Sequence, residues 1–204
     1  MRLPRTAHGE LPWRIHGFAR DFDVEDVWSY RTPGAGPDDF SVMLAAISTA
    51  GRLDRQGPPA RALFAVRRKL GALFGWDRPG TGVGARVESL RDRLPPELRE
   101  TADGSGAGAG GPFTTVYETH DESVRELANK TVHTLMHLGW VPAGAGGYEL
   151  RMAVLVKPNG RFGRLYMALI APFRHLIIYP GLTRQWERAW RERPAAPGSP
   201  GARP

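Results

Sequence analysis

The sequence of 204 residues contains no cysteine. This absence excludes disulfide frameworks, thiol nucleophiles and zinc sites built from cysteine, and it is typical of a reducing compartment. The opening residues MRLPRTAHGELPWRIHG also lack the continuous apolar run of a secretory signal. We therefore expect a cytoplasmic protein.

Lysine is nearly absent, since only three of the 28 basic residues are lysines and the rest are arginines. Together with the abundant alanine, glycine and proline, this bias is typical of a GC-rich genome. The net charge of +7 is consequently weak evidence for a polyanionic partner. We do not expect a nucleic-acid partner.

No apolar run long enough to cross a bilayer is free of charge. The most apolar segment, residues 162–182, contains Arg164 and Arg174 and is interrupted by Pro172. An arginine at the centre of a bilayer costs about 2.5–3.5 kcal/mol. The sequence therefore does not predict a transmembrane protein.

The length fits one domain. Residues 1–12 are expected to form a flexible arm, and the Pro- and Gly-rich residues 194–204 a disordered tail. Residues 13–193 then make the domain, with a flexible Gly-rich insertion near 101–112. The insertion contains a G-x-G-x-x-G spacing, but it lacks the strand and helix that a dinucleotide site needs, so no cofactor is predicted.

The first half of the domain mixes strands and helices. Residues 21–30 read as a strand, and residues 38–49 as a helix with Phe40, Met43, Leu44 and Ile47 on one face. The spacing predicts a second, basic amphipathic helix over 61–76 and a partly helical stretch over 87–98. Residues 113–119 and 123–128 read as strands.

Residues 131–141 and 148–158 predict a β-hairpin around the turn residues 142–147. Apolar side chains alternate along both arms, which is typical of a half-buried antiparallel sheet. On this parity His133 and His137 fall on the solvent face. In a strand, residues four apart stand about 13 Å from one another. We therefore expect surface histidines and not a metal pair.

A helix is predicted from Arg161 onward, because apolar residues recur three or four positions apart. This stripe, which we expect to contribute strongly to the core, consists of Phe162, Leu165, Tyr166, Leu169, Ile170, Phe173, Leu176 and Ile177. Pro172 should kink the helix, and Pro180-Gly181 should break it before a final amphipathic piece. Helices gathered on one face of an antiparallel sheet make an α+β fold.

Four segments resemble a bacterial family known as domain of unknown function 2867. They are DVEDVWSYRTPG (23–34), RALFAVRRKLGALFGW (61–76), LANKTVHTLMHLGWV (127–141) and MAVLVKPNGRFGRLYMALIAPFRHLIIYP (152–180). The chain is also similar to the START/polyketide-cyclase (SRPBCC) helix-grip superfamily. That resemblance implies a curved antiparallel sheet wrapped around a long C-terminal helix, with a ligand between them. It supplies no catalytic residues.

We expect a binding protein for a small apolar or amphipathic molecule, with an apolar cavity between sheet and helix. The candidate ligand-binding residues are Tyr117, Met136, Trp140, Tyr148, Met152, Tyr166, Arg174 and His175. Two alternatives stay open. One is a cyclase- or hydratase-like enzyme on the same scaffold, using Glu126, Arg174 or His175. The other is a basic module that binds anionic surfaces through the arginines of 61–69 and 184–193. The sequence leaves the oligomeric state undetermined.

Overall fold

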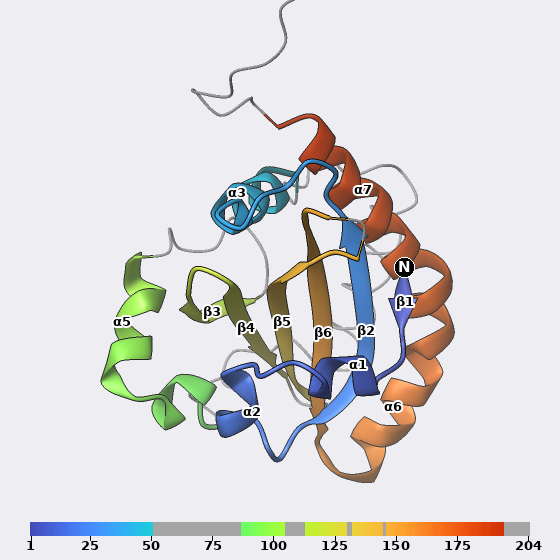
Figure 1. Cartoon of the computed structure of the whole chain (residues 1–204). Helices are drawn as coiled ribbons and strands as arrows, with labels where there is room; N and C mark the ends of the chain where they lie inside the picture. The colour runs from blue at the N-terminus through green and yellow to red at the C-terminus, as the bar shows by residue number, and fades with distance from the viewer. Residues whose placement is uncertain (51–86, 105–112, 130–131, 145, 194–204) are drawn as a thin grey trace, which may run out of the picture.

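The computed structural model describes residues 1–50, 87–104, 113–129, 132–144 and 146–193. Within them the protein is α+β: one antiparallel sheet stands at the centre, and helices lie around it (Figure 1). The predicted helix over 61–76 and the expected tail over 194–204 lie outside the described residues.

The sheet has six strands in the order β1-β2-β6-β5-β4-β3, and every pairing is antiparallel. The strands are β1 (Arg2–Leu3), β2 (Asp23–Arg31), β3 (Thr114–Glu118), β4 (Glu122–Ala128), β5 (Val132–Pro142) and β6 (Tyr148–Pro158). The predicted hairpin is confirmed as β5 and β6. Its turn includes Gly146 and Gly147, whose positive φ angles of 84° and 81° favour glycine.

Short helices precede and interrupt the strands, and one long helical segment follows them. The helices are α1 (Thr6–Gly9), α2 (Ile15–Phe18), α3 (Phe40–Ala50), the 3₁₀ turn η2 (Leu90–Arg93), α5 (Pro96–Gly104), α6 (Gly160–Phe173), the π-helical η3 (Arg174–Ile178) and α7 (Tyr179–Arg191). In α3 the predicted face is confirmed, because Phe40, Met43, Leu44 and Ile47 are all buried.

The N-terminal residues 1–12, expected to be a flexible arm, instead contribute β1 and α1 to the folded domain. Arg2 pairs with Trp28 at the edge of the sheet, and Ala7 and His8 are buried. Residues 101–104 of the expected insertion likewise form the end of α5. Both segments are held by contacts with distant strands, which local composition does not encode.

Both faces of the sheet are covered. One face packs against α1, α2, η2 and α5 in a cluster that includes Trp13, Ile15, Leu90 and Leu135. The other packs against α3 and α7 around the aromatic side chains of Tyr30, Trp140, Trp186 and Trp190. The strand parity was therefore right, but the expectation of one solvent-facing side was wrong. His133 and His137 are buried, with 3% and 1% of their surface exposed.

The C-terminal helix runs from α6 through η3 into α7 along the side of the molecule (Figure 1). The expected break at Pro180-Gly181 does not occur: the backbone stays helical from Ile178 into α7, and Pro180 lies directly after the π-helical segment. Pro172 lies inside α6, and the π-helical segment begins two residues after it.

The predicted core stripe of this helix is wrong for most of its members. Leu165, Leu169, Phe173, Leu176 and Ile177 are all exposed. The buried side of α6 instead carries Gly163 and Met167, and Met167 packs on Val132 and Val156. The side chains of Phe162 and Tyr166 lie outside the described part. Helical periodicity shows which residues share a face, but it does not show which face meets the protein.

Candidate functional site

Two glutamates of β4 each hold the start of a short helix. Glu122 accepts hydrogen bonds from the backbone N–H groups of Arg14 and Ile15, at 3.0 and 3.1 Å, where α2 begins. Glu126 accepts from the backbone N–H of Leu90 at 3.0 Å and from the Ser89 hydroxyl, where η2 begins. Because the first N–H groups of a helix lack internal partners, both buried carboxylates are stabilised there. These contacts fix two helices on one face of the sheet.

Each of these glutamates also contacts a histidine of the neighbouring strand β5. His133 Nε2 lies 3.2 Å from Glu126 Oε2, and His137 Nε2 lies 3.2 Å from Glu122 Oε1. Each histidine is diagonal to its glutamate, since the register places Val124 opposite His137. The same Glu–His contact therefore occurs twice, and the two contacts are four residues apart on each strand.

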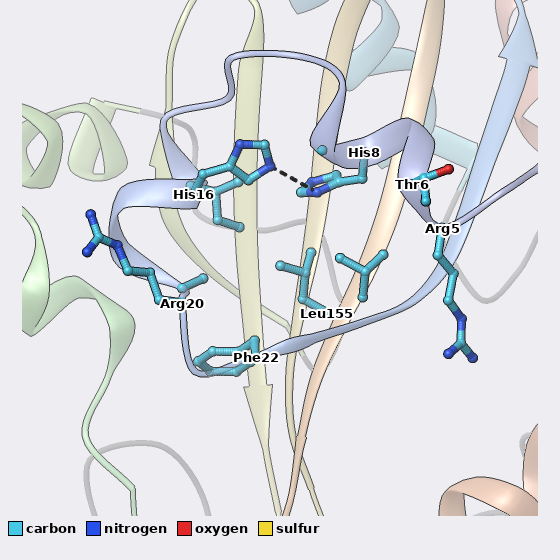
Figure 2. Close-up of a pocket in the computed structure, with 11 residues that line it drawn as sticks. Arg5, Thr6, His8, His16, Arg20, Phe22 and Leu155 are labelled. Carbon is cyan, nitrogen blue, oxygen red and sulfur yellow. Dashed lines mark hydrogen bonds between the residues drawn. The ribbon is translucent and has the colours of Figure 1, made fainter.

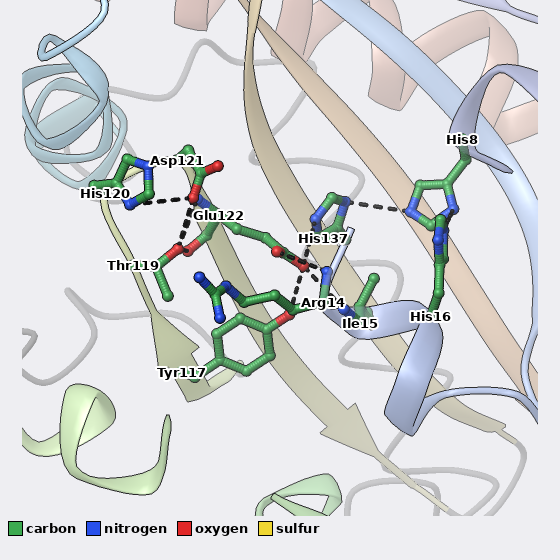
Figure 3. Close-up of polar contacts among 10 residues, drawn as sticks. All are labelled: His8, Arg14, Ile15, His16, Tyr117, Thr119, His120, Asp121, Glu122 and His137. Atoms are coloured by element: carbon green, nitrogen blue, oxygen red, sulfur yellow. Dashed lines mark hydrogen bonds and ion pairs between the residues drawn. The ribbon is translucent and has the colours of Figure 1, made fainter. Parts of the chain in front are cut away.

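Two further histidines from the N-terminal segment extend the pair formed by Glu122 and His137 (Figure 3). His8 Nε2 lies 3.3 Å from His137 Nδ1, and His16 Nε2 lies 3.1 Å from His8 Nδ1. His8 and His137 are buried, whereas His16 is partly exposed. A chain of three imidazoles thus connects a solvent-accessible ring to a buried carboxylate.

One choice of tautomer serves the whole chain. With the proton on Nε2 of each neutral ring, His16 donates to His8 and His8 donates to His137. The N–H of His137 then faces Glu122, although this last contact is not aligned as a hydrogen bond. The three imidazoles are therefore linked in one direction by hydrogen bonds, and the last ring faces a carboxylate to which it is not hydrogen-bonded.

Burial sets the charge state of His8, whereas hydrogen bonds and the neighbouring histidine set that of Glu122. Burial, with smaller contributions from His137 and His16, lowers the pKa of His8 to about 3. Burial also lowers the pKa of His16. For Glu122, burial raises the pKa, but His137, the Tyr117 hydroxyl and the Arg14 N–H outweigh it and bring the pKa to about 2. At neutral pH, Glu122 is ionised and His8 is neutral.

A pocket of about 330 Å³ opens beside His8 and His16 (Figure 2). Its apolar part is formed by Ile15, Ala19, Phe22, Val24 and Leu155, and its polar part by Arg5, Thr6, His8, His16 and Arg20, with Gly9 completing the lining. The volume is near the lower end of the range for small-molecule sites, the hollow is open to solvent, and its lining is divided about equally between polar and apolar residues.

The two arginines of the pocket differ in their partners. Arg5 donates to the backbone oxygen of Glu25 at 2.8 Å and also reaches its carboxylate. Arg20, on the opposite side in Figure 2, is exposed and makes no ion pair with the part of the chain that the structure describes. Arg20 is therefore available to an anionic group at the rim.

Among the described residues, no group of three or more histidine, aspartate or glutamate side chains is placed to hold a metal ion. In the tautomers described above, the Nδ1 lone pairs of His8 and His137 each accept an N–H from the preceding ring, so neither faces an open site.

The structure brings together only some of the residues predicted to bind a ligand. Met136, Trp140, Tyr148 and Met152 belong to one cluster on the α7 side of the sheet, where Trp140 lies against Tyr148 and Trp190. Tyr117 lies on the opposite face and donates a hydrogen bond to Glu122. The side chain of Tyr166 lies outside the described part.

The predicted pair Arg174 and His175 lies against β2, where both contact the buried carboxylate of Asp26. Arg174 Nη2 is 3.7 Å from Asp26 Oδ2, and His175 Nε2 is 3.4 Å from Oδ1. Tyr179 donates to the same carboxylate at 2.8 Å, and burial raises its pKa. The π-helical turn brings Arg174 and Tyr179, five residues apart, to one side of the helix. These residues anchor the helix to the sheet.

A family model described as "Protein of unknown function (DUF2867)" matches residues 18–181. The chain belongs to this family. The match covers β2 through the beginning of α7, so it includes His133, His137 and both β4 glutamates. It begins after His8 and His16, so the outer half of the imidazole chain lies before the matched region. No curated protein and no solved structure matches the chain.

This site was not predicted from the sequence, although one signal for it is present. Glu122 and Glu126 share a strand parity and a spacing of four, as do His133 and His137 on the next strand. Two glutamates and two histidines with the same spacing on neighbouring strands indicate buried Glu–His contacts, once it is known that both faces of the sheet are covered. The contribution of His8 and His16 had no local signal, because His8 reaches His137 from 129 residues away.

Proposed function

We propose that the protein binds a small amphipathic molecule with an anionic group in the pocket beside His8 and His16. The supporting observation is the lining itself: a floor of Phe22, Val24 and Leu155 lies below two imidazoles. Arg20, which is exposed at the rim, supplies a cation for the anionic end. The apolar part of such a ligand would displace water from the floor.

The same function was expected between the sheet and the C-terminal helix, as in helix-grip proteins. A helix-grip arrangement would place the ligand between the sheet and α7, and α7 packs on the sheet through Trp186 and Trp190. Two of the expected lining residues on that side pack against each other, with the Trp140 and Tyr148 ring centroids 6.1 Å apart. We therefore assign the binding site to the pocket on the opposite face.

Thermal unfolding with decanoate and decanol tests the proposal, since a ligand that binds only the folded state raises the melting temperature. Decanoate should raise it more than decanol. Thr6→Trp should abolish both effects by filling the pocket from an exposed position. Arg20→Gln should reduce the effect of decanoate alone, and the matched control Arg191→Gln, on exposed α7 surface, should change neither. Equal stabilisation of wild type and Thr6→Trp would contradict the proposal.

The imidazole chain favours a second candidate, a hydratase-like enzyme in the same pocket. Water would add across the double bond of a 2-alkenoate, with hydroxyl going to the β carbon and a proton to the α carbon. His16 and His8 would exchange the proton with the substrate. The wild type should remove the conjugated ultraviolet absorbance of trans-2-decenoate. A His16→Gln variant that leaves this absorbance in place would support this candidate. Unchanged absorbance at saturating protein would exclude it for this substrate class.

A further inference from the structure

Six large apolar side chains project from one side of the C-terminal helix into solvent. This apolar stripe consists of Leu165, Leu169, Phe173, Leu176, Ile177 and Ile178, which are between 39% and 76% exposed. The first four recur four, four and three residues apart, which keeps them on one helical face. Contiguous exposed apolar surface of this kind marks interaction sites.

The opposite side of the helix holds the stripe outward. Met167 packs on Val132 and Val156, and Arg174 and Tyr179 reach Asp26. Because the π-helical turn directs Arg174 and Tyr179 to the sheet, the intervening Leu176, Ile177 and Ile178 all face away from it. The exposure is therefore built into the packing of the helix.

By length and composition, the helix Gly163–Arg191 is the one in the described part that could cross a membrane. Its second half, however, buries Tyr179, Trp186 and Trp190 in the core of the domain. Spanning a bilayer would remove these side chains from the core. A helix with one buried side and one exposed apolar side fits the plane of a membrane interface instead.

Charge around the stripe indicates the chemistry of its partner. Residues 160–186 contain no aspartate or glutamate, and they contain four arginines. Arg164 and Arg184 are exposed at the two ends of the stripe, and Arg188 is exposed one turn further on. Anionic lipid headgroups supply the counter-charge while the acyl region receives the apolar side chains.

A second copy of the chain fits this surface less well. In a two-fold dimer the same surface of each copy meets the other. A basic side chain in that surface therefore needs an acidic side chain within the same surface as its partner. Within the described part of residues 160–186 the exposed charges are all positive, and the next acidic side chain along the helix, Glu187, is buried and paired with Arg31. Self-pairing would bring arginines together without carboxylates.

We propose that the apolar stripe of the C-terminal helix docks the protein on the surface of an anionic lipid bilayer. The stripe lies flat at the interface, and Arg164 and Arg184 contact the headgroups. This proposal is independent of the pocket function, because it rests on a different surface. In this arrangement the protein lies on the membrane surface and does not cross the bilayer.

Sedimentation with vesicles of phosphatidylcholine, alone or with about a third phosphatidylglycerol, tests the proposal. The full chain should bind the mixed vesicles and lose binding as salt rises. Leu169→Ser with Leu176→Ser should weaken binding about tenfold, because both acyl contacts are lost. Ala168→Ser, at an exposed position on the same helix, should leave binding unchanged. Arg164→Gln with Arg184→Gln should weaken binding to mixed vesicles only.

Three outcomes would overturn the proposal. The first is equal binding of the wild type and the double serine variant. The second is a wild-type dimer, seen by analytical ultracentrifugation without lipid, that the double serine variant dissociates while vesicle binding is absent. The third is a melting temperature of the double serine variant, without vesicles, that falls by much more than two serines on an exposed helix face cost, which would show that other residues of the chain cover the stripe.

Discussion

The indole of Trp13 lies directly on the backbone of Gly139. A Cβ atom added to Gly139 would come within 2.4 Å of Trp13 Cη2. Trp13 belongs to the loop between α1 and α2, and its ring also meets His137 edge-on at a centroid distance of 4.9 Å. Because Gly139 has no side chain, the N-terminal segment can pack closely over the Glu–His pairs.

Gly139→Ala should consequently destabilise the protein. The rigid ring cannot move without displacing its neighbours, so we expect a loss of about 1–3 kcal/mol in the free energy of unfolding. Gly17→Ala is the matched control, since a Cβ on Gly17 meets nothing within 4 Å. Urea denaturation measures both variants. Equal stability of Gly139→Ala and Gly17→Ala would show that the indole is free to shift.

Stability should fall in mild acid because of His8. The pKa of His8 is about 3 in the folded protein, against 6.5 for an unperturbed histidine. Between these values the unfolded state binds the additional proton, so the stability contribution is complete above pH 6.5 and is lost as pH falls. The loss should be on the order of 1 kcal/mol per pH unit below about pH 6. Urea titrations at several pH values measure it.

His8→Gln should flatten this pH dependence, because the variant removes the group whose pKa differs between the two states. His120→Gln should leave the slope unchanged, since the His120 side chain is 82% exposed. If His8→Gln and the wild type have the same slope, another group causes the acid sensitivity.

Removing the charge of Glu122 should release helix α2. A glutamine keeps one acceptor oxygen, but Arg14, Ile15 and Tyr117 all donate to this carboxylate. Glu122→Gln should therefore cost about 2–3 kcal/mol in the free energy of unfolding and speed amide exchange at Arg14 and Ile15. Glu97→Gln, at an exposed position, is the control. Unchanged exchange at these two amides would contradict the capping role.

The anchor between the C-terminal helix and the sheet should depend on the Tyr179 hydroxyl. Tyr179→Phe leaves one oxygen of the buried Asp26 without its hydrogen bond. The expected loss is about 1.5–3 kcal/mol, because the acceptor is a carboxylate. Tyr148→Phe should cost little, since Tyr148 is only half-buried. Chemical denaturation compares the two variants, and equal losses would argue against the anchor.

Much of the local structure was predictable because it depends on neighbouring residues. Turn chemistry and alternation placed the hairpin of β5 and β6, and helical spacing placed α3 with its buried face. The candidate site was not predictable in the same way. Glu126 was considered as a catalytic base. In the structure its carboxylate accepts hydrogen bonds from the Ser89 hydroxyl and the Leu90 N–H, and it contacts the His133 ring.

The amino-acid sequence by itself determined which side chains share a face of each strand and helix, because those periods are fixed by backbone geometry. Only the tertiary structure decided which faces are covered. The N-terminal segment buries the hairpin histidines from more than a hundred residues away, and the helix–sheet contacts at Asp26 turn an apolar stripe toward solvent. Coverage depends on contacts between segments far apart in the chain, and a local pattern does not contain them.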